Sequence, residues 1–144
     1  MSDHERPLNK RGLRDAPRMG RLLREHDLLP DLIACSTAER ARETTAAVAE
    51  HAGFQGRIEF TGDLYHAPPQ ACIQVLHELG GDFSRVMLVA HNPGLESLVE
   101  MLSGRSEPFP TATLAHVELE VECWTELSPH SNAQLVNLWR PKEL

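Results

Sequence analysis

The stretch that decides the fold is "VMLVAHNPGLE", residues 86–96. Its first five residues are all apolar, which is typical of an inner strand of a parallel sheet that is buried on both faces. His91 ends this run, and residues 93–104 then show the start, periodicity and closing glycine of a helix. We therefore expect His91 at a strand-to-helix junction, the place where open parallel sheets bind their ligands.

A second junction of the same kind precedes it. The apolar run "DLIAC", residues 31–35, predicts a short strand, and "STAERARETTAAVAEHAG", residues 36–53, predicts a helix closed by Gly53. Ser36 and Glu39 match a capping box, which would start the helix directly at the end of the strand. This junction places Arg40 in the first turn of the helix.

Strands and helices alternate through the rest of the chain. A helix capped by Asn9 is expected within residues 7–30, with a kink or a late start at Pro17. A strand at 57–62, a helix at 68–81 and a C-terminal hairpin of 113–124 with 133–139 complete the prediction. The expected fold is a three-layer α/β/α sandwich in one domain, residues 1–144, with a mostly parallel sheet and an antiparallel C-terminal edge.

Composition narrows the function classes. The chain has 14 basic and 21 acidic residues and a net charge of -7, which argues against nucleic-acid binding and requires any anion site to be a local cluster. No apolar run approaches the ~20 residues of a membrane span, and the polar start "MSDHERPLNKRG" has no signal-peptide h-region. Cys35, Cys72 and Cys123 lie within apolar stretches, so we expect reduced core cysteines in a cytoplasmic protein.

Both junctions could hold an anion. A helix N-terminus offers free N–H groups and partial positive charge, and Arg40 could add a planar fork of donors suited to phosphate. His91 and the neighbouring Asn92 could donate to phosphate oxygens, and bound phosphate would favour protonated His91. Simpler interpretations are open for each: a solvated helix arginine, a loop histidine satisfied by backbone, and a Pro93 that merely starts a helix.

Three segments in order carry a resemblance. "PLNKRGLRDA" (7–16), "CSTAERARETT" (35–45) and "VMLVAHNPGLE" resemble blocks of the histidine phosphatase superfamily, the phosphoglycerate mutase-like proteins, and specifically its small SixA-like branch. Arg40 matches the second phosphate-binding arginine of that family, and His91 matches its second histidine. The resemblance covers roughly residues 3 to 103.

The resemblance implies a metal-independent phosphatase without a cofactor. Such an enzyme transfers a phosphoryl group to a nucleophilic histidine and then hydrolyses it, acting on a phosphohistidine-bearing protein or a small phosphorylated molecule. The SixA-like branch acts on phosphoramidates and need not carry a carboxylic general acid. His66 or Asp63 could protonate a leaving group, although a loop histidine and a helix-flanking aspartate are simpler interpretations.

The sequence departs from the family at its start. In the family, an apolar strand ending in Arg-His-Gly or Arg-His-Ala precedes the first block and carries the nucleophile. Only "MSDHER" (1–6) precedes that block here, and His4 follows no apolar run, so we assign the nucleophile to no residue. Three explanations compete: an N-terminally incomplete phosphatase, a non-catalytic phosphate-binding module, and a different α/β protein. We favour the first, and expect residues 1–144 alone to be poorly stable or to self-associate along exposed sheet edges.

Overall fold

Three parallel strands form the centre of the molecule. The computed structural model describes residues 1–144 and contains β1 (Leu32–Ser36), β2 (Arg57–Thr61) and β3 (Val86–Val89) in the order β2-β1-β3. All five residues of β1 are buried, because both edges of this strand are paired and both of its faces are covered. The predicted parallel sheet is confirmed, but the inner strand is β1, and β3 has one free edge.

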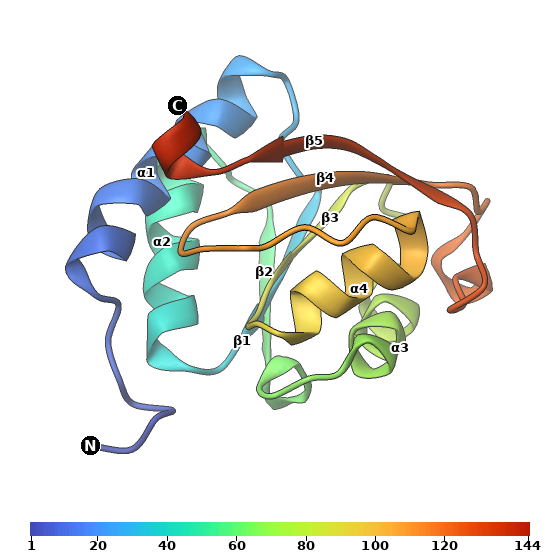
Figure 1. The fold of residues 1–144 in the computed structure, drawn as a ribbon, viewed down its shortest axis with the longest axis horizontal. Helices are drawn as coiled ribbons and strands as arrows, with labels where there is room; N and C mark the ends of the chain where they lie inside the picture. Colours follow the sequence, from blue (N-terminus) through green and yellow to red (C-terminus); the bar gives the residue numbers. More distant parts are fainter.

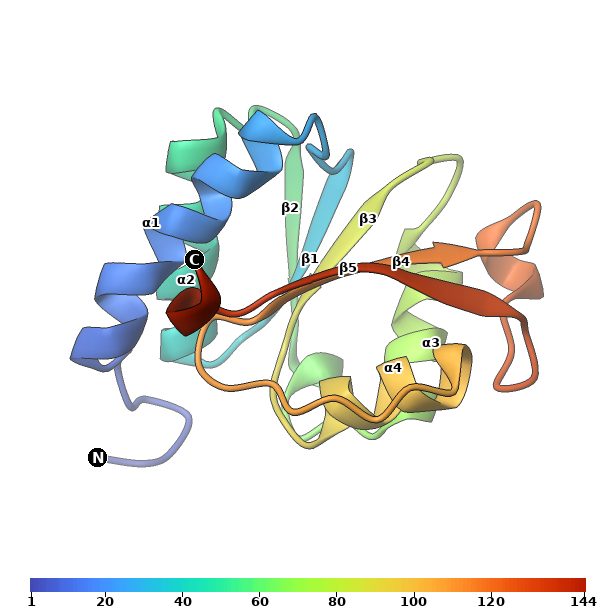
Figure 2. The ribbon, with the colours of Figure 1, turned by 45° about the horizontal axis from the view of Figure 1, so that its top comes forward.

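Helices cover both faces of this sheet. The pair α1 (Lys10–Glu25) and α2 (Glu39–Ala52) lies on one side, and α3 (Pro69–Leu79) with α4 (Gly94–Ser103) lies on the other, as Figures 1 and 2 show. Each pair buries its own apolar cluster: Met19, Leu23 and Val48 on the first side, and Ile73, Leu76 and Leu98 on the second. None of the helices combines the length and apolar character that a membrane crossing requires.

The helix ends test the sequence signals individually. Asn9 caps α1 as predicted, because its Oδ1 accepts the N–H of Gly12 at 2.9 Å. The helix runs through Pro17 from Lys10, so a late start was wrong. Gly53 ends α2 with φ of 71°, a left-handed conformation that glycine adopts at little cost.

The predicted capping box at the start of α2 is wrong. Ser36 still belongs to β1, and Ala38 occupies the N-cap without any side-chain hydrogen bond. The N–H of Glu39 instead donates to the backbone oxygen of His4 at 2.9 Å. The strand thus runs farther than expected and leaves the Ser36 hydroxyl for another partner.

The C-terminal strands form the predicted hairpin, but in a sheet of their own. Strands β4 (Leu114–Leu119) and β5 (Ala133–Trp139) pair antiparallel with each other and with no other strand. The connecting turn is bonded to the loop between α3 and β3, since Trp124 Nε1 donates to the oxygen of Phe83 at 2.7 Å. Cys123 lies in this exposed connection, outside the core to which the sequence pattern assigned it, whereas Cys35 and Cys72 are buried.

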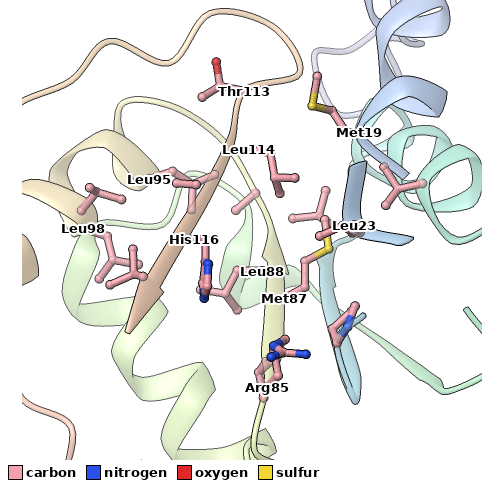
Figure 3. Close-up of a pocket in the computed structure, with 18 of the residues that line it drawn as sticks. Met19, Leu23, Arg85, Met87, Leu88, Leu95, Leu98, Thr113, Leu114 and His116 are labelled. Carbon is pink, nitrogen blue, oxygen red and sulfur yellow. The ribbon is translucent and has the colours of Figure 1, made fainter. Parts of the chain in front are cut away.

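A large cavity separates the two sheets. It has a volume of about 1150 Å³ and a mostly apolar lining. Residues of β3 and β4 and side chains of α1 and α4 line it. Figure 3 shows the side chains that point into it, among them Met19, Leu23, Met87, Leu88, Leu95, Leu98 and Leu114. We call this the inter-sheet cavity. It lies along the free edge of β3, where a strand paired with both sheets would make them one.

Candidate active site

Arg40 and His91 lie at the same end of the inter-sheet cavity. Arg40 is the second residue of α2, His91 follows β3 by two positions, and both side chains line the cavity. They are close enough for the Arg40 charge to lower the pKa of His91. Residues separated by 51 positions therefore meet at the carboxyl edge of the parallel sheet, because β1 and β3 are adjacent and run in the same direction.

His91 is a neutral histidine in this site. Burial, followed by the positive charge of Arg40, lowers its pKa from the ordinary value of 6.5 to about 4. Its Nε2 lies 2.8 Å from the hydroxyl oxygen of Ser36, and the Tyr65 ring meets the imidazole edge-on with centroids 5.5 Å apart. The imidazole is thus held on one side by a strand and on another by an aromatic ring.

The guanidinium of Arg40 already holds an anionic group. Its Nη1 donates to the backbone oxygen of Asp3 at 2.8 Å, and its Nη2 donates to the Asp3 carboxylate at 3.2 Å. The hydroxyl of Tyr65 donates to the same carboxylate at 2.5 Å, and this bond, with the charge of Arg40, lowers the pKa of Asp3. Tyr65 correspondingly has a raised pKa, because its proton is held by Asp3. These donors form a cradle for negative charge.

Three histidines surround Tyr65. The ring of His4 lies 4.8 Å from it and that of His66 lies 4.0 Å from it, in addition to His91. His4 Nε2 also contacts the hydroxyl of Thr37 at 2.8 Å. The structure thus places His66 beside the site, close enough for its charge to act on His91.

Asn92 also lines the inter-sheet cavity, whereas Asp63 does not. The Asn92 side chain is exposed and donates to the oxygen of Phe109 at 2.7 Å, which commits one of its amide hydrogens to the protein. Asp63 is exposed, and its backbone N–H donates to the hydroxyl of Thr61. Neither contact connects these residues to Arg40 or His91.

Asp3, Tyr65 and Ser36 are the residues that the sequence did not assign to the site. Asp3 and Tyr65 lie in irregular segments, where no periodicity indicates which side chains meet. Ser36 carried a visible signal, but the spacing to Glu39 pointed to a helix cap. Only the pairing of β1 with β3 reveals that Ser36 faces His91.

An α/β sheet with a basic and imidazole-bearing pocket beyond its carboxyl edge defines a class of anion-binding proteins, many of them phosphoryl-transfer enzymes. The comparisons with known proteins make the class specific. Residues 2–65 match the model of the histidine phosphatase superfamily (branch 1). An uncharacterized protein from Mycobacterium tuberculosis is 31% identical over 140 residues, which span 90% of this chain and 85% of the relative. The chain belongs to the histidine phosphatase superfamily.

Solved structures agree with this family. A protein assigned as phosphohistidine phosphatase SixA from Nakamurella multipartitia superposes with a TM-score of 0.85 and 26% identity, covering 97% of this chain and 87% of that one. Its counterpart from Agrobacterium tumefaciens superposes with a TM-score of 0.81 and 27% identity, covering 98% of this chain and 87% of that one. The phosphoglycerate mutase-like fold predicted from the sequence is confirmed.

Proposed function

We propose that this chain is the phosphate-binding body of a SixA-like phosphatase that removes phosphoryl groups from phosphohistidine or from a small phosphorylated substrate. The observation that carries the proposal is the convergence of Arg40 and His91 at one end of the inter-sheet cavity. Arg40 supplies a fork of donors for two phosphate oxygens, and His91 supplies a further donor. The SixA names of the structural neighbours support this substrate class.

The nucleophile in this proposal is a histidine on a strand that occupies the inter-sheet cavity. The cavity borders β3, whose free edge offers unpaired N–H and C=O groups, and it ends at Arg40 and His91. A strand parallel to β3 would therefore deliver its last residues to the phosphate cradle. The apolar lining suits a strand that is buried on both faces.

The proposed reaction has two steps. The imidazole nitrogen of the strand's histidine forms a bond to phosphorus while the bond from phosphorus to the leaving group breaks, and the leaving group takes up a proton. Water then displaces the imidazole and releases phosphate. Arg40 and His91 stabilise the equatorial oxygens in both steps, and electrostatic stabilisation of this kind is often the largest contribution to the rate.

The second candidate is a phosphate-binding module without turnover. The contact between Asp3 and Arg40 favours it, because it shows an anionic group held at this site with no histidine bonded to that group. His4, the histidine nearest the start of the chain, bonds Thr37 and does not line the inter-sheet cavity. Within residues 1–144, His91 is therefore the one histidine that both lines the inter-sheet cavity and lies beside Arg40.

Binding of vanadate, a phosphate mimic, tests the pocket. Arg40→Ala should weaken binding at least tenfold, because it removes the charged donors. Arg42→Ala is the matched control: Arg42 lies two residues along the same helix, with its guanidinium 4.3 Å from the Phe60 ring and donating to Thr37. Equal affinity in both variants would overturn the pocket assignment.

Turnover separates the two candidates. An apolar strand ending in Arg-His would be fused ahead of Met1, and the same fusion ending in Arg-Asn would serve as its control. Phosphate release from a phosphohistidine peptide by the first fusion alone supports the phosphatase. Vanadate binding by both fusions without phosphate release by either would establish the binding module instead.

A further inference from the structure

The hydrogen bond between Ser36 and His91 has an unusual setting. Ser36 is the last residue of β1, and its side chain is fully buried. Its hydroxyl oxygen has two partners: the backbone N–H of Ala38 at 3.2 Å and Nε2 of His91 at 2.8 Å. The bond to His91 joins the end of β1 to the segment that follows β3, at the edge where the anion cradle lies.

The positions of the protons follow from these two partners. The N–H of Ala38 can only donate, so it uses a lone pair of the Ser36 oxygen and leaves the hydroxyl proton free. Buried hydroxyl groups in folded proteins are paired, and Nε2 of His91 is the acceptor within reach. Ser36 therefore donates to Nε2, and Nε2 carries no proton of its own.

The charge state of His91 agrees with this assignment. The groups that act on the imidazole are Arg40, His66 and His4, which disfavour its protonation, and Asp3, which favours it. Burial lowers the pKa of His91 most strongly, so this pKa lies well below neutral pH and the ring holds a single proton. With Nε2 accepting from Ser36, that proton is on Nδ1. The hydrogen bond that the imidazole makes within the chain is the one between Nε2 and Ser36, which leaves the Nδ1 proton for a ligand.

We propose that Ser36 is a positioning residue that fixes His91 in the Nδ1–H tautomer, so that His91 meets a phosphate oxygen as a neutral donor. The proposal rests on the proposed function in one respect, namely that the ligand is phosphate. In the opposite tautomer, Nδ1 would turn a lone pair toward the anion, and the cradle would lose one donor. Ser36 thus determines which nitrogen of His91, 55 positions farther along the sequence, carries the proton.

The tautomer of His91 can be read directly by long-range ¹H–¹⁵N NMR at neutral pH, with His91→Asn used to assign the signals. We expect a protonated Nδ1 in the wild-type chain, a shift toward protonated Nε2 in Ser36→Ala, and restoration in Ser36→Thr, which keeps a hydroxyl. Thr45→Ala is the matched control, because it removes another buried hydroxyl, bonded to Cys35, without contacting His91. It should leave the tautomer unchanged.

Vanadate affinity provides the second measurement. Ser36→Ala should weaken binding about tenfold, the usual effect of losing one hydrogen bond to a charged ligand, and Ser36→Thr should recover most of it. Protonated Nε2 in the wild-type chain would overturn the proposal without any variant, as would a tautomer that is identical in wild type and Ser36→Ala. An Nδ1–H tautomer that depends on Ser36, in a chain that binds no vanadate, would uphold the positioning role and refute the phosphate site.

Discussion

Replacing Gly94 by alanine should destabilise the protein through a single atom. Gly94 is the first residue of α4, and a Cβ at this position would lie 2.1 Å from the backbone oxygen of Ala67, where contacts under 3.0 Å essentially never occur. The obstructing atom belongs to the backbone, so no side-chain rotation relieves the clash. Overpacking costs about 1–3 kcal/mol, and we expect the upper end of that range, because either α4 or the segment carrying Ala67 must move.

An opposing effect is smaller. Alanine lowers the entropy of the unfolded chain and would by itself stabilise the protein by about 0.4–1 kcal/mol, which leaves a net loss of about 2 kcal/mol. Gly62→Ala is the matched control, because the nearest atom to its new Cβ is Thr37 Oγ1 at 3.9 Å. Urea unfolding followed by circular dichroism gives both free energies of unfolding. A midpoint for Gly94→Ala equal to that of Gly62→Ala would refute the reasoning.

Three other perturbations follow from the site and the sheets. Asp3→Asn should raise vanadate affinity about two- to fivefold, because an exposed carboxylate no longer competes for Arg40, and this gain should be smaller at high salt. Unchanged affinity in titration calorimetry would show that Asp3 does not compete. The free energy of unfolding should fall as the pH drops from 6.5 toward 4, because His91 is protonated in the unfolded chain but stays neutral in the folded chain. His91→Asn should flatten this pH dependence in urea unfolding midpoints, and an identical slope in the variant would contradict the reasoning. The wild-type chain should form larger species with rising concentration in sedimentation velocity, because β3 and β4 have free edges, whereas a monomer at all concentrations that melts cooperatively would count against it.

Sequence reasoning succeeded where a pattern reports a local cause. The unbroken apolar run before His91 and the cap at Asn9 are signals contained within a few residues, and the strand and the helix that they predict both formed. The order of the junctions also placed Arg40 and His91 at one edge, because parallel strands must present their carboxyl ends together.

It failed where a distant partner decides the outcome. The capping box at Ser36 was wrong because the hydroxyl is committed to His91 across the sheet, which a local spacing cannot show. An apolar run also cannot tell how many neighbours a strand has: β3 reads as an inner strand, yet it borders the inter-sheet cavity. Asp3 reaches Arg40 from an irregular segment, where no periodicity predicts contacts.

The separate hydrogen bonding of the two sheets has a consequence for how the protein could be assembled. Helices cover both faces of the parallel sheet, and the hairpin forms its own ladder and is bonded through Trp124 to the loop between α3 and β3. The two units share the inter-sheet cavity but no backbone pairing, so a strand entering the cavity would gain ladder bonds at the free edge of β3 and apolar contacts with the hairpin side of the cavity. Such a body is suited to fragment complementation, in which a short synthetic strand supplied in solution joins the two sheets and reports its own binding by the stability that it confers.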